Sequence, residues 1–328
     1  MIDAIIAAMN KKFFILISVF CWLCPAASAE EKPLYEIQTD NPMYVEDGLY
    51  KEVYDSGETK RLITFENELP NGPFNVFYKD GTLKGEGLYV KGVLQLKART
   101  YYPNAAIQTE LNYKDGVLDG SNKIYSKEGK LLREAIYKNG YLHGLIKEYW
   151  TTGELRYERN YEQGVEWGEA REFAKDGRLL VASAFKNGVQ EGIIRIYDSN
   201  GRVRKAFEAS DGVPAGEVKE FFPTGELRSK GMLNQDGTIA DGIVTEYYKT
   251  GEVWRSVEVK DGIRHGFSQE YHRTGNLRRK GNYLQGKKEG VFQVFYNNGY
   301  IKREEVYKDG QQVSVTNFDE YAKKEIQK

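Results

Sequence analysis

The stretch YKNGYLHGLIKEYWTTGELR, residues 137–156, decides the fold because its pattern recurs along the chain. It contains an Asn-Gly, a His-Gly and a Thr-Thr-Gly, separated by short runs rich in tyrosine and aliphatic side chains. Asn-Gly between such runs supplies the positive φ that a tight hairpin turn needs. A glycine about every twelve residues would also interrupt a helix. The stretch therefore predicts antiparallel strands joined by turns.

Four columns of residues repeat at a spacing of 24 positions, with a two-residue insertion near Gln235. The first column, called the spine below, is aromatic and comprises Phe77, Tyr101, Tyr125, Tyr149, Phe173, Tyr197, Phe221, Tyr247, Tyr271 and Phe295. Glycine recurs from Gly57 to Gly299, an aliphatic residue follows it two positions later, and a second aromatic column begins at Phe65. Periods of this length indicate repeat proteins, so we predict about eleven units.

The predicted fold is all-β: an elongated, twisted antiparallel sheet of about eleven 24-residue β-hairpin repeats in residues 50–310. A single hairpin is marginal in water, so each unit must bury apolar surface against its neighbours. We expect each spine ring to pack on the ring one repeat away. Residues 30–49 form an N-terminal lead-in. Asn317, followed three positions later by Glu320, predicts a short capping helix within a C-terminal cap of residues 311–328.

Residues 1–29 have the features of an export signal. Lys11 and Lys12 precede an apolar run, and Ala27-Ser28-Ala29 fits the cleavage pattern, so we predict cleavage after Ala29 and a periplasmic or secreted protein. Both cysteines, Cys21 and Cys24, lie in this segment, so the mature chain would contain no disulfide. The alternative is a lipoprotein acylated on Cys24, although Leu23 is not the small residue that usually precedes such a cysteine.

Charge and composition exclude several classes of function. The 47 basic and 48 acidic residues balance, whereas a general nucleic-acid binder needs a basic field. His143 and His265 precede the second glycine of their units, where a turn explains them, and His272 lies in another column. Without a mature cysteine or a carboxylate cluster at ligand spacing, we predict no metal site and no cofactor. The aspartates mostly precede turn glycines, and no catalytic motif is present, so we predict that the protein is not an enzyme.

The unit Tyr-x-x-Gly-x-x-x-Gly followed by an aromatic residue, as in residues 137–149, resembles the MORN repeat. Its 24-residue form with a Gly-x-Leu turn resembles the variant MORN repeats of the YwqK-type antitoxin family, and the resemblance covers residues 50–310. It implies an immunity protein (antitoxin) that neutralises a toxic effector by direct occlusion, for example a lipase or wall-degrading enzyme encoded nearby. The alternative is an envelope structural protein or a binder of lipid or a surface ligand, since MORN repeats are also linked with membrane association.

The residue after each spine aromatic forms a variable column, which we consider the candidate partner-binding surface. Alternation along a strand would turn this residue to the face opposite the spine. The column is still rich in the aromatic residues that dominate interface hot spots. Its candidate binding residues are Tyr78, Tyr102, Trp150, Phe222, Tyr248, His272 and Tyr296. The alternative is that these rings only cover the second face of the sheet.

Overall fold

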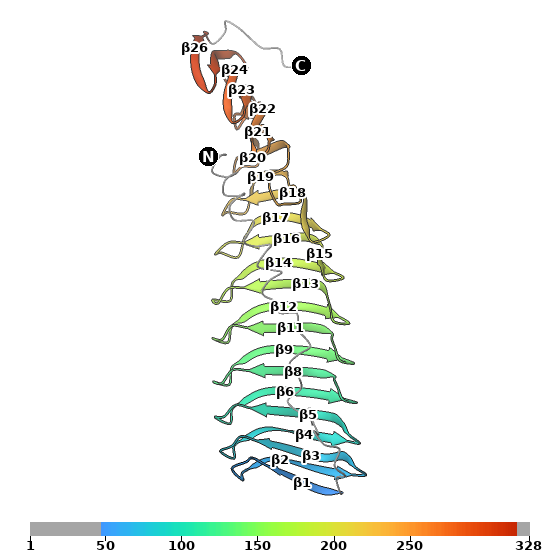
Figure 1. Cartoon of the computed structure of the whole chain (residues 1–328). Helices are drawn as coiled ribbons and strands as arrows, with labels where there is room; N and C mark the ends of the chain where they lie inside the picture. The colour runs from blue at the N-terminus through green and yellow to red at the C-terminus, as the bar shows by residue number, and fades with distance from the viewer. Residues whose placement is uncertain (1–46, 320–328) are drawn as a thin grey trace. The chain divides into compact units, whose positions relative to one another are not determined.

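A computed structural model describes residues 47–319, so the predicted export signal and most of the lead-in lie outside the described residues. Within that range the chain forms 26 strands and no helix, which confirms the all-β hairpin-repeat prediction (Figure 1). The last strand ends at Asn317, and residues 320–328, where most of the predicted capping helix would lie, are outside the described range. Among residues 47–319 there is no helix of the length and apolarity that a membrane crossing needs.

The described chain falls into two compact units, residues 47–189 and 190–319. The N-terminal unit contains β1 (Gly48–Val53), β2 (Thr59–Glu66), β3 (Leu69–Phe77), β4 (Leu83–Val90), β5 (Val93–Tyr101), β6 (Ile107–Lys114), β7 (Val117–Leu118), β8 (Gly120–Tyr125), β9 (Leu131–Lys138), β10 (Tyr141–Leu142), β11 (Gly144–Tyr149), β12 (Leu155–Glu162), β13 (Val165–Phe173) and β14 (Leu179–Lys186). The chain passes into the second unit within β15 (Val189–Gln190).

The C-terminal unit contains β16 (Gly192–Tyr197), β17 (Val203–Ser210), β18 (Val213–Phe221), β19 (Leu227–Met232), β20 (Gly242–Tyr247), β21 (Val253–Lys260), β22 (Ile263–Tyr271), β23 (Leu277–Leu284), β24 (Lys287–Phe295), β25 (Ile301–Lys308) and β26 (Gln311–Asn317). In each unit the strands form a meander in which consecutive long strands pair antiparallel, as β12 does with β13 and β21 with β22 (Figure 1). Every repeat therefore contributes two neighbouring strands.

One edge of each unit is made of two-residue hairpin turns. Between β12 and β13, Glu162 pairs with Val165, and the two residues between them, Gln163 and Gly164, have φ of 49° and 80°. Positive φ at both positions is the type I′ geometry, whose twist matches that of the flanking strands. The Gly164 N–H donates a hydrogen bond of 2.8 Å to the Leu142 carbonyl of the preceding repeat. These turns, called the tight-turn edge below, therefore join consecutive hairpins.

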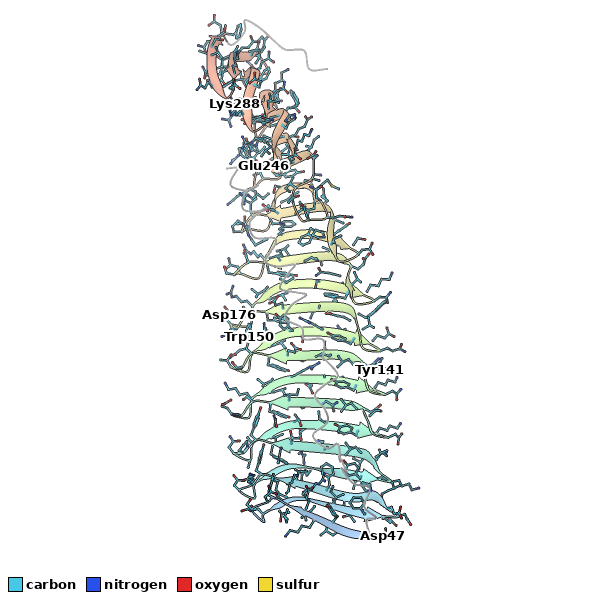
Figure 2. All side chains as sticks on the ribbon, in the orientation of Figure 1. Asp47, Tyr141, Trp150, Asp176, Glu246 and Lys288 are labelled. Carbon is cyan, nitrogen blue, oxygen red and sulfur yellow. The ribbon has the colours of Figure 1, made fainter. Side chains whose placement is uncertain are left out.

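The opposite edge consists of longer turns that contain the predicted glycine column. After β13, the Ala174 N–H donates to the Arg178 carbonyl at 2.8 Å, and the Gly177 N–H donates to the Ala174 carbonyl at 2.9 Å. Figure 2 shows Trp150 and Asp176 at this edge and Tyr141 at the tight-turn edge of the N-terminal unit. The two kinds of turn thus alternate along the chain and separate cleanly in space within that unit.

The second glycine of the repeat, replaced by Leu96 in one unit, lies in a β-bulge, so the prediction of a turn at His143 and His265 is wrong. Gly144 and Gly266, which follow these histidines, have φ of 85° and 90°. The pairing register shifts between Val257 and Val259, opposite the bulge that contains Gly266. Three residues, from His265 to Phe267, lie opposite Glu258 alone, so the bulge takes up two extra residues, and its left-handed position favours glycine. Both histidines therefore lie beside a bulge in one arm of a hairpin, which explains them structurally.

The two faces of each unit differ in burial. The packed face carries the buried apolar side chains, among them Ile63, Phe74, Tyr89, Ala98, Ile146 and Ala170 in the N-terminal unit and Ile194, Phe207, Val218, Val257 and Phe292 in the C-terminal unit. Aromatic rings pair across this face, with centroids 5.0 Å apart for Phe74 and Tyr89 and 5.5 Å apart for Tyr283 and Phe292. We call the other face of each unit the open face.

The spine aromatics do not stack on one another, so the predicted ring ladder is wrong. Two strands per repeat place rings of successive repeats about 10 Å apart, whereas ring pairs form at about 4.5–7 Å. In the part of the chain that the structure describes, no ring pair joins two spine residues. Instead the Tyr101 hydroxyl donates to Glu86 Oε1 at 2.6 Å on the open face. The spine therefore supports polar groups of the preceding repeat.

Candidate functional site

The variable column lies in the longer turns, one residue after the strand ends. β3 ends at Phe77, for example, so Tyr78 opens the turn and strand alternation does not set its direction. Four members donate a side-chain hydrogen bond to the spine carbonyl of the next repeat: Tyr78 to Tyr101 at 2.7 Å, Tyr102 to Tyr125 at 2.9 Å, Trp150 to Phe173 at 3.4 Å and Tyr248 to Tyr271 at 2.8 Å. These half-buried side chains therefore tie consecutive repeats together.

The other three candidates, Phe222, His272 and Tyr296, occupy equivalent turns of the C-terminal unit and are also half-buried. Lysine ammonium groups lie over two of these rings, 5.8 Å from Phe222 and 5.4 Å from Tyr296. The column is thus regular in position, and within each unit it lines the edge of the longer turns. A partner-binding role for it stays a prediction.

Alternating charges cross the open face of the N-terminal unit. Side chains directly opposite one another on consecutive strands form what we call the N-terminal row: Glu86, Arg99, Glu110, Lys123, Glu134, Lys147, Glu158 and Arg171. Acidic and basic residues alternate without exception, and ion pairs of 2.9 Å and 3.3 Å join Arg99 to Glu110 and Lys123 to Glu134. The hydrogen bond from Arg99 holds the pKa of Glu110 below its usual value. Each charge in this row therefore has an opposite neighbour.

The corresponding row of the C-terminal unit contains few acidic residues. This C-terminal row comprises Arg195, Ala206, Lys219, Lys230, Thr245, Ser256, Gln269, Lys280, Gln293 and Glu304. It contains four basic residues and one acidic residue. Beside it, Glu217 pairs with both Lys219 at 2.8 Å and Lys230 at 3.5 Å, so one carboxylate serves two ammonium groups. The hydrogen bond from Lys219 lowers the pKa of Glu217.

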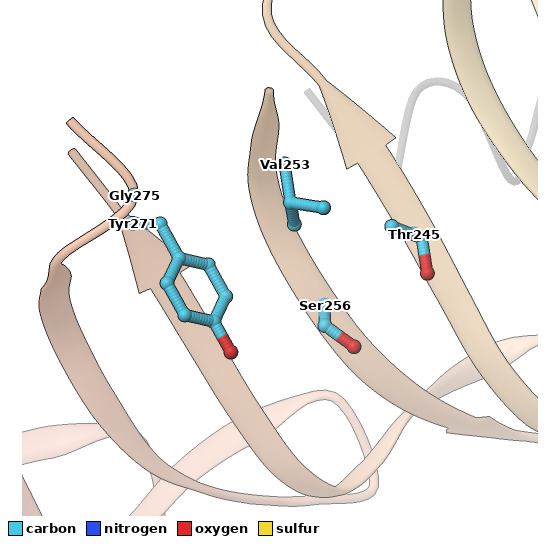
Figure 3. Close-up of a pocket in the computed structure, with 5 residues that line it drawn as sticks. All are labelled: Thr245, Val253, Ser256, Tyr271 and Gly275. Atoms are coloured by element: carbon cyan, nitrogen blue, oxygen red, sulfur yellow. The ribbon is translucent and has the colours of Figure 1, made fainter. Parts of the chain in front are cut away.

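Short side chains in the middle of the C-terminal row leave a hollow of about 450 Å³. It is lined by Thr245, Val253, Ser256, Tyr271 and Gly275, from three neighbouring strands and the turn that follows them (Figure 3). Three of these residues carry hydroxyl groups, and the Tyr271 hydroxyl donates to Gln269 Oε1 at 2.9 Å. Lys230 lies directly opposite Thr245. The hollow thus combines hydroxyl groups with a neighbouring positive charge.

Exposed apolar side chains accompany the C-terminal row on the open face. Ile193, Ile243, Phe267 and Val291, which we call the apolar column, are 39–59% exposed. Each precedes a member of the row by two positions on the same strand and so shares its face. The fifth equivalent position of the C-terminal unit is Glu217, and those of the N-terminal unit are the mixed set Pro73, Lys97, Ser121, Leu145 and Glu169. The sequence analysis missed both rows and this column, although reading the strand centres at the same spacing of 24 would have found them.

The described residues contain no group of three or more His, Cys, Asp or Glu placed to hold a metal ion. The charged rows instead consist of pairs spread across many strands.

Comparison with known proteins identifies the repeat. A family model described as "MORN repeat variant" matches residues 118–139, 142–163, 215–235, 264–285 and 288–309. No curated protein matches the chain.

Solved structures with some similarity include the complex named TcdB2-TccC3-Cdc42 (16% identity, TM-score 0.17, 78% of this chain and 14% of that chain). Others are the Tc holotoxin pore of Photorhabdus luminescens (14% identity, TM-score 0.17, 82% of this chain and 16% of that chain) and a porin-like protein from Bacteroides uniformis (9% identity, TM-score 0.17, 66% of this chain and 91% of that chain). The chain thus spans less than a fifth of the first two of these chains.

Proposed function

We propose that this chain, a member of the MORN-variant repeat family, is a non-catalytic protein that binds a protein partner through the open face of residues 190–319. The observation that carries the proposal is the apolar column. Ile243 and Val291 are 59% and 51% exposed on a face where the equivalent positions of the N-terminal unit include the polar residues Lys97, Ser121 and Glu169. Exposed apolar side chains that recur on one face of a sheet mark a surface that another molecule covers.

MORN-type repeats are consistent with binding of proteins or of lipids, and the surroundings of the apolar column favour a protein. Glu208 lies directly opposite Ile193, and Glu258 lies directly opposite Ile243. An anionic membrane surface presents one sign of charge and would repel these carboxylates. A protein surface can present both signs and match the acidic and basic groups of this face together.

We further propose that the partner is a toxic effector and that the chain is an immunity protein that neutralises it by direct occlusion in the periplasm or outside the cell. The resemblance of the 24-residue unit to YwqK-type antitoxin repeats supports this role, and the export signal that we predict in residues 1–29 supports the location. A lipase or wall-degrading enzyme encoded nearby is the kind of effector that an exported protector would meet. Occlusion requires only shape and charge complementarity, so no cofactor is involved.

Purification of the full, exported chain with its bound proteins tests this proposal. We expect a one-to-one complex with a toxic protein encoded nearby, and protection of cells that express both. The double variant Ile243→Ser/Phe267→Ser should lose the complex and the protection. Its matched control is Val93→Ser/Val117→Ser, because these valines of the tight-turn edge are 41% and 45% exposed. Binding to vesicles without any protein complex would overturn the proposal, and so would a complex that the first variant leaves intact.

A further inference from the structure

In the C-terminal row two positive charges lie directly opposite each other, an arrangement that the N-terminal row does not contain. Lys219 and Lys230 lie directly opposite each other on β18 and β19, whereas each basic residue inside the N-terminal row lies between two glutamates. Like charges directly opposite on neighbouring strands are destabilising. Arg195, two strands before Lys219, adds a third positive charge. Glu217 pairs with both lysines and Glu208 also interacts with Lys219, so three positive charges face two negative charges at this end of the row.

The hollow continues the same surface with hydrogen-bond donors. Thr245 and Ser256 face each other across β20 and β21, and their hydroxyl groups lie in the space bordered by the Tyr271 ring (Figure 3). Hydroxyl donors beside an ammonium group recognise a carboxylate, because hydrogen bonds to a charged acceptor are short and strong. The volume of about 450 Å³ is large enough to admit an acidic side chain.

We propose that the partner presents an acidic protein surface to the C-terminal row, with carboxylates that pair with Arg195, Lys219 and Lys230 and one acidic side chain that enters the hollow. This inference rests on the proposed function, because it names the chemistry of the partner that the same face binds. Charge complementarity of this kind sets the orientation and the association rate of a complex more than its area does.

A protein suits this face better than another polyanion. Ile243 and Phe267 lie two positions from Thr245 and Gln269 on the same strands, so an occupant of the row also covers apolar side chains. A sulfated glycan offers charge without extended apolar surface, and an anionic membrane would meet Glu208 and Glu258. An acidic protein surface offers carboxylates, apolar contacts and basic groups at once.

Charge removal tests the inference with a labelled oligoglutamate peptide as the probe and fluorescence anisotropy as the readout. We expect the full chain to bind the peptide at low salt and to release it as salt rises. The variant Arg195→Gln/Lys219→Gln/Lys230→Gln should weaken binding by about tenfold or more. The control Lys97→Gln/Lys123→Gln/Lys147→Gln removes three lysines that are each ion-paired to a glutamate, and it should change binding by about twofold or less.

The hollow is tested without a change of charge. Ser256→Leu fills the space and removes a hydroxyl, and it should weaken the peptide complex while the β-type circular dichroism spectrum is retained. Absence of oligoglutamate binding would overturn the inference, as would binding that both triple variants reduce equally. Tighter binding of dextran sulfate or of anionic vesicles than of oligoglutamate, lost in the Arg195 variant, would assign the row to a glycan or a membrane.

Failure of this inference can be told apart from failure of the proposed function. A protein complex from cells that requires Ile243 and Phe267, but is indifferent to salt and to the Arg195 triple variant, would keep the proposed function and reject the acidic partner. Loss of that complex in both variants, together with oligoglutamate binding, supports both.

Discussion

In the N-terminal unit the alternating charges cross the open face, whereas in the C-terminal unit the alternation lies on the packed face. There the opposed residues run Lys205, Glu220, Ser229, Glu246, Arg255, Glu270 and Arg279. Glu246 and Arg255 form an ion pair of 2.7 Å with side chains only 5% and 9% exposed, while Lys123 and Glu134 are 36% and 34% exposed. The same hairpin repeat thus holds ion pairs in a buried and in an exposed environment. In the C-terminal unit the row on the open face is left with more basic than acidic residues.

The largest difference between the units should appear when one acid of each alternation is neutralised. Glu246→Gln removes the carboxylate that is ion-paired with the buried Arg255 guanidinium, and breaking a buried pair in this way costs about 3–5 kcal/mol of unfolding free energy. Glu134→Gln breaks an exposed pair with Lys123 and should cost about 1 kcal/mol or less. Urea unfolding followed by circular dichroism measures both.

A second variant separates charge from packing at the buried pair. In Glu246→Leu/Arg255→Met both charges are replaced by apolar side chains, and most of the lost stability should return. Equal costs for Glu246→Gln and Glu134→Gln would show that the two faces are not different environments for ions, which would remove the basis of the comparison.

Packing under the aromatic rings should be the same in both units. A Cβ on Gly87 would lie 2.5 Å from the Phe74 ring, and one on Gly281 would lie 2.3 Å from the Phe292 ring. Gly87→Ala and Gly281→Ala should therefore each cost about 1–3 kcal/mol, because overpacking forces rings and backbone apart. Gly231→Ala is the control, since its Cβ would lie 3.3 Å from Val244 Cγ2 and needs only a small adjustment. Thermal unfolding of the three variants gives the order, and a greater loss at Gly231 would contradict it.

Lys205 makes the C-terminal unit sensitive to pH. Burial lowers the pKa of its ammonium group to about 8, although the facing Glu220 acts in the opposite direction. Between about pH 8 and 10.5 the unfolded chain binds more protons than the folded chain, so stability should rise with pH across that window. Lys205→Met should lack this rise, which is on the order of 2–3 kcal/mol. Urea midpoints measured across the window test it, and parallel pH profiles would contradict the assignment.

Sequence periodicity predicts the repeat unit, the strands and the tight turns, because those depend on residues at a fixed spacing and on the positive φ that glycine permits. The bulge at Gly144 could not be predicted as a bulge. Turns and bulges both place glycine at a position of positive φ, so the sequence alone does not distinguish them. The spine rings do not stack because each repeat contributes two strands. Rings of successive repeats, such as Phe77 and Tyr101, are therefore too far apart for contact.

The candidate surfaces required the pairing register. Lys219 and Lys230 are eleven positions apart in the sequence, and only the hairpin register places them opposite each other. The hydrogen bonds from Tyr78 and Tyr102 to the next repeat depend on how each longer turn directs its first side chain. Composition cannot give that direction, so the same aromatic column was equally compatible with a binding surface and with a structural tie between repeats.

The smallest expected effect concerns this tie between repeats. Tyr78→Phe removes the hydroxyl that donates to the Tyr101 carbonyl and should lower unfolding free energy by about 1 kcal/mol, the usual net value of one hydrogen bond. Tyr248→Phe removes the equivalent bond in the C-terminal unit and should cost the same. Both variants keep their rings, so a partner that binds the aromatic surface of the column would be retained. Hydrogen exchange of the Tyr101 and Tyr271 segments locates the loss of stability. Variants that bind the partner more weakly without any loss of stability would instead support a partner-binding role for the variable column.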